Sequence, residues 1–168
     1  MPGSLFIVAA PSGSGKSTLV NALLAKEPGI SLSISYTSRG PRPGEEDGKH
    51  YHFVTREKFE EMAGEGEFFE YAIVHGDLKG TARQSVEPLL ASGQDVLLEI
   101  DYQGAQRVRA QVPSAVSIFI LPPSRLELER RLRTRAKDTE ATILRRLADS
   151  RKEIAHAWEF DYIVVNEV

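Results

Sequence analysis

The stretch Ala10-Pro11-Ser12-Gly13-Ser14-Gly15-Lys16-Ser17 decides the fold, because it directly follows the apolar run Leu5-Phe6-Ile7-Val8-Ala9. A short buried strand, a glycine-rich turn and a Lys-Ser-Thr opening of an apolar-periodic helix form the context of a phosphate-binding loop. Glycines let backbone N–H groups point inward at an anion, and the N-terminus of the following helix adds to that field. We therefore predict that residues 10–18 bind the phosphates of a nucleoside triphosphate.

Individual residues of this loop have separate expected roles. Lys16 supplies a mobile charge for the β- and γ-phosphates, and the Ser17 hydroxyl, followed by Thr18, is a ligand for Mg²⁺. Ala10 stands where the usual pattern has its first glycine, and its small side chain makes this a tolerated variant. The alternative is a Gly/Ser-rich surface turn beside a strand, but the strand, the spacing and the helix together favour the phosphate loop.

Composition narrows the class of protein. A chain of 168 residues with 41% hydrophobic content suits one domain, residues 1–168, with its own core. The net charge of −3 and the absence of a long apolar run give no sign of a nucleic-acid or membrane partner. The chain has no cysteine, which excludes disulfides and cysteine metal sites and is compatible with the cytoplasmic location that we expect.

Strand-like and helix-like segments alternate along the chain, which predicts an α/β fold with a central, mostly parallel sheet flanked by helices. The expected strands are residues 5–9, 31–36, 51–54, 68–74, 95–100, 115–121 and 162–165. The expected helices are residues 17–26, 55–62, roughly 82–92, 125–135 behind a Ser124–Glu127 capping box, and one from the polar break at 136–138 to about residue 157. Pro88 removes one hydrogen bond from the third of these helices, so we expect that helix to start late or to kink.

The last predicted strand is followed only by Asn166, Glu167 and Val168. A parallel sheet is normally covered by helices on both faces, and no predicted helix covers this strand. We therefore expect that a C-terminal helix is missing from the chain.

The polar loop over residues 37–50 is a candidate for a second phosphate site. Arg39 and Arg42 lie in it, between Ser35 and Tyr51, and prolines and glycines fix its shape. Planar guanidinium groups bind a phosphate in bidentate fashion. The alternative interpretation is a solvated basic loop.

Acidic residues mark two further positions. Glu99 and Asp101 end a buried strand, at the edge of an open α/β sheet where ligands and Mg²⁺ gather. Glu70 interrupts the apolar run of residues 68–71. Ordinary strand-end polar residues and a solvent-facing strand residue would look similar, so both alternatives stay open at this point.

Arginines gather around the polar break at residues 136–138. Such a cluster can close over phosphates and stabilise charge as a phosphoryl group is transferred. The alternative is a solvated amphipathic helix with ion pairs four residues apart, and some of these arginines do only that. The arginines concerned are Arg130, Arg131, Arg133, Arg135, Arg145 and Arg146.

Over nearly its whole length the chain resembles the guanylate kinases. The resemblance is carried, besides the phosphate loop, by Ser38-Arg-Gly-Pro-Arg-Pro-Gly-Glu45, Gly48-Lys-His-Tyr51, Phe69-Glu70, Gly80-Thr81, Glu99-Ile-Asp-Tyr-Gln-Gly104, Leu121-Pro-Pro-Ser124, Arg131-Leu-x-x-Arg135 and Ile163-Val-Val-Asn166. It implies a core (residues 1–34, 83–130 and 147–168), a small GMP-binding region (35–82) and an arginine-rich lid (about 131–146). The implied reaction is in-line transfer from ATP to GMP or dGMP, with Mg²⁺ and without a covalent intermediate.

The resemblance also implies roles for single residues. Asn166 would lie near the adenine and complete the ATP site of residues 10–18, and Asp101 would reach the Mg²⁺ on Ser17 through water. The implied catalytic residues are Lys16, Arg39, Arg131, Arg135 and Arg146. The implied GMP-binding residues are Ser35, Arg39, Arg42, Tyr51, Glu70, Lys79, Thr81, Glu99 and Asp101, with Ser35, Glu70 and Thr81 at the guanine.

Three positions depart from the family pattern. Lys79 stands where a second phosphate-binding tyrosine is expected, Glu99 stands where aspartate is usual, and Ala136 replaces the glycine of the lid's Arg-Gly. Two other functions remain open from the sequence: a non-enzymatic guanylate-kinase-like module that binds proteins, and a related kinase for another phosphorylated acceptor.

Overall fold

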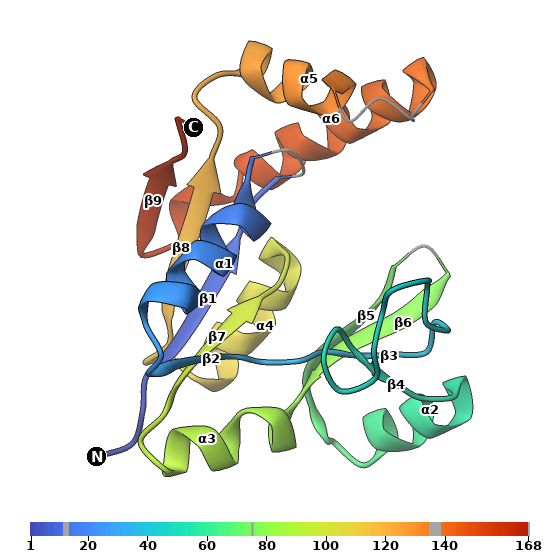
Figure 1. Cartoon of the computed structure of the whole chain (residues 1–168), viewed down its shortest axis with the longest axis vertical. Coiled ribbons are helices and arrows are strands. Elements are labelled where there is room, and N and C mark those ends of the chain that lie inside the picture. Colours follow the sequence, from blue (N-terminus) through green and yellow to red (C-terminus); the bar gives the residue numbers. More distant parts are fainter. Residues whose placement is uncertain (12–13, 75, 135–138, 168) are drawn as a thin grey trace.

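The computed structural model describes residues 1–11, 14–74, 76–134 and 139–167. Its core is a five-stranded sheet in which every neighbouring pair of strands is parallel (Figure 1). The strands lie in the order β2 (Ile30–Leu32), β7 (Asp95–Glu99), β1 (Leu5–Ala9), β8 (Val116–Leu121) and β9 (Tyr162–Val165). β1 is central, so the loop that follows it opens at the middle of the sheet edge.

Helices cover both faces of this sheet. Helix α1 (Lys16–Lys26) packs through Val20 on the face that carries Val8 and Leu97. Helix α4 (Tyr102–Gln111) packs through Ala105 and Val108 on the opposite face. The predicted fold class, a mostly parallel sheet flanked by helices, is therefore confirmed.

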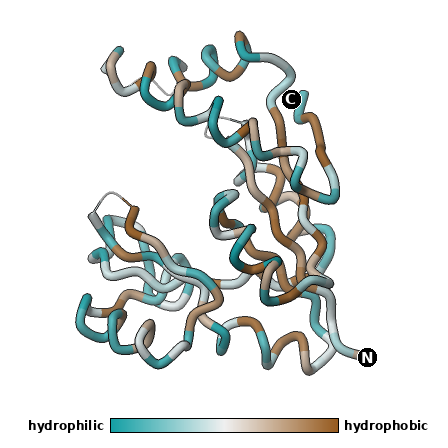
Figure 2. Tube along the Cα trace, turned by 180° about the vertical axis from the view of Figure 1, so that it is seen from behind, coloured by the Kyte–Doolittle hydropathy of each residue, from teal (hydrophilic) through white to brown (hydrophobic). Residues whose placement is uncertain are grey.

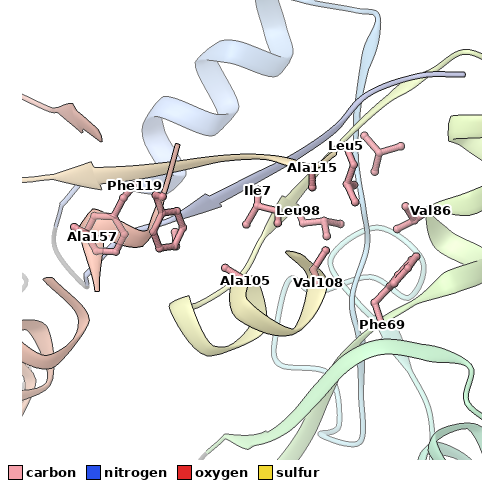
Figure 3. Packing of buried hydrophobic residues seen from close by; sticks show 13 residues of the cluster. Leu5, Ile7, Phe69, Val86, Leu98, Ala105, Val108, Ala115, Phe119 and Ala157 are labelled. Atoms are coloured by element: carbon pink, nitrogen blue, oxygen red, sulfur yellow. The ribbon is translucent and has the colours of Figure 1, made fainter. Parts of the chain in front are cut away.

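The larger core cluster joins α4 to the sheet (Figure 3). Ile7, Leu98 and Phe119 come from the three central strands and are almost completely buried. Phe69 belongs to the same cluster although it lies in the second sheet, beside Val108 of α4. This packing fixes the second sheet against α4 and so sets its distance from the carboxyl ends of β1 and β7.

The second sheet has four strands in the order β4 (His52–Phe53), β3 (Tyr36–Thr37), β6 (Asp77–Ala82) and β5 (Phe68–Val74). β5 and β6 are antiparallel, as are β6 and β3. Helix α2 (Arg56–Gly64) packs Phe59 and Met62 against Phe68, and Thr55 caps the helix by accepting a hydrogen bond from the Lys58 N–H.

Helices α5 (Arg125–Thr134) and α6 (Glu140–Ile154) form an arm above the carboxyl edge of the main sheet. Arg133 of α5 joins them through an ion pair with Glu140 of α6, with an N–O distance of 2.6 Å, and it also pairs with Glu129 of its own helix over 2.9 Å. The arm and the second sheet extend toward the same side of the molecule (Figure 2). Within the described residues, no helix has both the length and the apolar character that crossing a bilayer requires.

One predicted strand was wrong in extent, and one predicted helix is shorter for the reason that its proline indicated. The strand expected over residues 31–36 divides, because β2 ends at Leu32 and β3 begins at Tyr36 in the other sheet. The helix expected at roughly residues 82–92 starts late, as Pro88 predicted: it is α3 (Glu87–Ala91), because Pro88 has no N–H and is tolerated only in the first turn of a helix. A 3₁₀ turn over Arg83–Ser85 precedes it.

Two elements were not predicted at all. Residues 77–82 form β6, although no strand was expected there, and residues 102–111 form α4. Asp101 marks the start of α4, because its carboxylate accepts a hydrogen bond of 2.7 Å from the Gly104 N–H.

Candidate active site

A cleft of about 460 Å³ lies between the phosphate loop and the second sheet. Three parts of the chain line it: the start of α1, the end of β7 with the residues after it, and the inner face of the second sheet. Seven of the predicted site residues line this one cleft: Lys16, Ser35, Tyr51, Glu70, Lys79, Glu99 and Asp101.

The described part of the predicted phosphate loop leads directly into α1. Gly15 has a φ of 84° and directly precedes α1. Ser14 is buried, and its hydroxyl donates a hydrogen bond of 2.5 Å to the Pro11 carbonyl. No side chain of the described residues caps the N-terminus of α1, so its first N–H groups are suited to an anion. The predicted residues Ser12 and Gly13 lie outside the described residues.

Oxygen ligands suited to a divalent ion meet next to this loop. The Ser17 hydroxyl, at the start of α1, donates to Oε1 of Glu99 over 3.3 Å. Hydroxyl and carboxylate oxygens are the ligands that Mg²⁺ prefers. Glu99, which the resemblance placed with GMP, thus lies beside the predicted phosphate loop.

Glu70 lies partly buried on β5 and is oriented by its neighbours. The Thr81 hydroxyl of β6 donates to Oε1 of Glu70 over 2.8 Å. Desolvation raises the pKa of Glu70, and the charge of Asp101 raises it further, while the Thr81 hydrogen bond and Arg107 oppose that shift. Glu70 is therefore a fixed carboxylate inside the cleft and not a solvated strand residue.

Gly104 makes room for this carboxylate. A Cβ at Gly104 would lie 3.2 Å from Oε2 of Glu70 and 3.3 Å from Oδ1 of Asp101. Gly104 belongs to the motif over residues 99–104, but this contact has no local sequence signal, because Glu70 and Gly104 belong to different elements.

Arg39 is held by a residue that was not among the predicted site residues. Its guanidinium forms a bidentate pair with Glu45, with N–O distances of 2.8 and 3.0 Å, and Glu45 also accepts from the Arg42 N–H over 2.8 Å. The hydrogen bond from Arg39 lowers the pKa of Glu45 to about 2. Glu45 ends the motif that contains both arginines, and this spacing is the signal that could have identified it.

The side chains of Arg39 and Lys79 both contact Tyr51. The Arg39 guanidinium lies over the Tyr51 ring, 5.3 Å from its centre, and the Lys79 ammonium donates to the Tyr51 hydroxyl over 3.3 Å. Two cations and a phenol therefore meet at one end of the cleft, which is the chemistry of a phosphate site. Arg42 is exposed at the adjoining turn.

The helical arm carries the predicted arginines Arg131 and Arg146, on α5 and α6. Arg131 donates from Nε to Glu127 over 3.0 Å and from Nη2 to the Asn166 carbonyl over 3.4 Å. Arg130 and Arg133 form ion pairs with glutamates within the arm, which is the structural role left open above. Arg135 lies outside the described residues.

Glu153 of α6 is an acidic residue near the site that sequence reasoning missed. It lines a second hollow of about 390 Å³ together with Asp101 and Asp149. Burial raises the pKa of Glu153 to about 7, and the positive charge of Lys16 opposes this shift. In the sequence it is one acidic residue of an amphipathic helix, and nothing local distinguishes it.

We expect Glu153→Gln to change how stability depends on pH. Because the folded-state pKa of about 7 lies above the ordinary 4.5, the folded protein binds more protons between these values, and stability falls as pH rises through this window. As the pH rises from 5 to 8, the free energy of unfolding of the variant should increase by about 1–2 kcal/mol relative to that of the wild type. This value is smaller than the full pKa shift implies, because water reaches the carboxylate and screens it. Urea unfolding at both pH values measures it.

Glu57→Gln, at an exposed glutamate of α2, is the control. Its free energy of unfolding relative to the wild type should differ between pH 5 and pH 8 by at most ~0.5 kcal/mol. Equal stability changes at both pH values in the Glu153 variant would show that Glu153 is ionised throughout.

The comparisons with known proteins agree with this geometry. The family model described as guanylate kinase matches residues 3–168. A guanylate kinase of Xanthomonas oryzae pv. oryzae is 63% identical over 99% of this chain and 82% of its own length, and one of Xylella fastidiosa is 60% identical over the same shares. The crystal structure of guanylate kinase from Anaplasma phagocytophilum superposes with a TM-score of 0.76 at 36% identity, covering 99% of this chain and 78% of that one.

The match of the family model over nearly the whole chain, the identity above 60% and the superposition point to one family. The chain belongs to the guanylate kinase family and is a nucleotide-binding kinase.

Proposed function

We propose that this chain transfers the γ-phosphoryl group of ATP to GMP or dGMP, giving ADP and GDP. The observation that carries the proposal is that one cleft is lined by both Lys16 of the phosphate loop and Glu70 of the second sheet. A donor triphosphate on the loop and an acceptor base on the sheet would therefore share one enclosed space, as direct transfer between them requires.

Glu70 is the group that selects guanine. The N1–H and exocyclic amine of guanine form a donor pair that one carboxylate accepts, and adenine offers no such pair. The Thr81 hydrogen bond and the room left by Gly104 fix the direction of the carboxylate. Ser35 lines the same part of the cleft.

The phosphate of GMP binds where Arg39, Tyr51 and Lys79 meet, with Arg42 adding a second guanidinium. Glu45 positions Arg39 through its bidentate pair. Lys79 contributes a point charge where the family pattern has a phenol. Its contact with the phosphate of GMP is therefore less directional than that of a tyrosine hydroxyl and depends more strongly on salt.

Catalysis in this proposal is positioning and neutralisation of charge. A phosphate oxygen of GMP is already anionic at neutral pH, so in-line attack needs no strong general base and no covalent intermediate. Lys16 binds the β- and γ-phosphates, and Arg131, Arg135 and Arg146 approach from the helical arm and stabilise the developing charge. In this division residues 35–82 bind GMP, residues about 131–146 act as the lid, and the remaining residues form the core.

The residues beside the phosphate loop suit a Mg²⁺ ion. The Ser17 hydroxyl and the Glu99 carboxylate, whose oxygens lie 3.3 Å apart, would hold it, with Asp101 acting through water. When bound, the ion neutralises charge on the β- and γ-phosphates. Asp101 also caps α4, which keeps its carboxylate at the edge of the cleft.

An assay of ADP formation with GMP, dGMP, AMP, UMP and ribose 5-phosphate as acceptors tests the proposal. We expect turnover with GMP and dGMP and at least a hundredfold lower kcat/KM with AMP, of the order that a site built for hydrogen bonding reaches. Preference for another acceptor would identify a related kinase. Binding of nucleotides without any turnover would identify a non-enzymatic module.

A further inference from the structure

Asn166, the first residue after β9, forms hydrogen bonds through its main-chain N–H, its side-chain amide and its main-chain carbonyl. Its N–H donates to the Leu121 carbonyl over 2.8 Å, which extends the pairing of β8 and β9 by one residue. Its side chain is buried, with 7% of the residue exposed, and Nδ2 donates to the Ser14 carbonyl over 2.9 Å. This last contact joins residues 152 positions apart in the chain.

The amide of Asn166 occupies the space next to Gly15 that a side chain would fill. A Cβ at Gly15 would lie 2.3 Å from Nδ2 of Asn166. Gly15 also has a φ of 84°, which side-chain-bearing residues rarely adopt. The glycine and the asparagine therefore depend on each other: the missing Cβ allows the amide to approach the loop backbone.

The hydrogen bond to Ser14 has a consequence for the next N–H. A trans peptide is planar, so the Ser14 carbonyl and the Gly15 N–H point in opposite directions. Because the Ser14 carbonyl points toward Asn166, the Gly15 N–H points away from Asn166. Gly15 directly precedes α1, at the position where N–H groups of such a loop bind phosphate. The orientation of one phosphate-binding group is thus set from the far end of the chain.

Asn166 also connects the loop to the helical arm. Its main-chain carbonyl accepts from Nη2 of Arg131 over 3.4 Å, while Nε of Arg131 donates to Glu127. One residue therefore contacts both the phosphate loop and an arginine that the proposed function assigns to the phosphates of ATP.

We propose that Asn166 is a positioning residue for the phosphate loop, which holds the Ser14–Gly15 peptide in the orientation that binds the triphosphate and ties this loop to Arg131. The inference rests on the proposed function for the identity of the ligand. It differs from the role implied by resemblance, in which Asn166 lies near the adenine, because the contact here is with the loop backbone.

Calorimetric titration of Asn166→Ala with ATP, inorganic tripolyphosphate and GMP, each with Mg²⁺, tests the proposal. We expect the Kd values of ATP and tripolyphosphate to rise by the same factor, about tenfold, as the loss of one hydrogen bond that orders the loop implies. The Kd of GMP should change less than about twofold, because its site lies on the second sheet. Glu167→Ala, the exposed neighbour, should change none of the three.

A double-mutant cycle with Gly15→Ala gives a second readout. The new Cβ would displace the Asn166 amide, so Gly15→Ala should weaken tripolyphosphate binding more in the wild type than in the Asn166→Ala background. If Gly15→Ala weakened tripolyphosphate binding equally in both backgrounds, Gly15 and Asn166 would not act through a shared contact.

Three results would overturn the proposal. Weaker ATP binding with unchanged tripolyphosphate binding would place Asn166 at the adenine. Equal weakening of all three ligands with a lower melting temperature would show a merely structural role, and no change in any Kd would show that the contact is dispensable. If GMP is not phosphorylated while ATP and tripolyphosphate respond as expected, the proposed function fails and the positioning role stands.

Discussion

Lys16→Ala should lower the rate of phosphoryl transfer by on the order of 10³-fold, about 4 kcal/mol of transition-state stabilisation. Lys16 begins α1 and lines the cleft beside Glu99, so its ammonium lies where the β- and γ-phosphates would bind. Charge on the phosphoryl oxygens is redistributed during transfer, and a cation fixed there stabilises the transition state more than the bound substrate. Steady-state kinetics with GMP and ATP measure the loss in kcat.

Lys26→Ala is the matched control for this experiment. Lys26 belongs to the last turn of the same helix and is exposed, so its removal changes the same charge without touching the cleft. Its kcat should stay within about twofold of the wild type, as expected for surface substitutions. Near-normal turnover of Lys16→Ala, with an unchanged circular dichroism spectrum and melting temperature, would show that the phosphate loop is not the donor site.

Elements with a strong local signal could be predicted from the sequence. The apolar runs of residues 5–9, 68–74 and 162–165 gave strands with the bounds that the structure has. The Thr55 cap was also predicted, because capping needs only a side chain and the N–H three residues on. In each case the residues that cause the structure are neighbours in the sequence.

β6 could not be predicted because its cause lies elsewhere in the chain. Residues 77–82 include a glycine, an aspartate and a lysine, which are poor strand formers. The segment is a strand because it pairs with β5 on one side and β3 on the other. Gly80 fits there because its missing Cβ, which would lie 2.9 Å from Cβ of Tyr71, leaves room for the paired strand.

The residues of the candidate site also fall into two groups, those that the sequence predicts and those that only the packing of the elements brings together. The phosphate loop and the arginine loop were predicted from their own residues, because these residue types have a chemistry of their own. A ligand-binding role for Glu70 was implied only by the resemblance, because its local sequence fits a solvent-facing strand residue equally well. The partners of these groups were not predicted: Glu45 on Arg39, Gly104 under Glu70 and Asn166 on Ser14 depend on how the elements pack. Motifs thus predict candidate ligand-binding groups, and only the packed structure identifies the groups that orient them.

The second large effect is expected for Glu70→Gln, which keeps the size of the side chain but replaces one acceptor oxygen with a donor. That donor would face the donor edge of guanine, so GMP should lose about 1–3 kcal/mol of binding free energy, and its Kd should rise roughly 5- to 150-fold. AMP binding should be little affected, and the preference for GMP over AMP should narrow. Competition between GMP and AMP in the turnover assay measures this preference.

The pKa of Glu70 adds a test that separates charge from shape. Burial raises this pKa, so lowering the pH protonates the free wild-type carboxylate earlier than an exposed one, and GMP binding should weaken as the pH falls. Glu70→Gln cannot titrate and should lose that pH dependence, while Glu65→Gln, at an exposed glutamate, should keep it. An unchanged preference for GMP in Glu70→Gln would mean that another group in the cleft selects the base. A lost pH dependence with unchanged preference would assign Glu70 to holding the second sheet against α4, because the carboxylate would then titrate without contacting guanine.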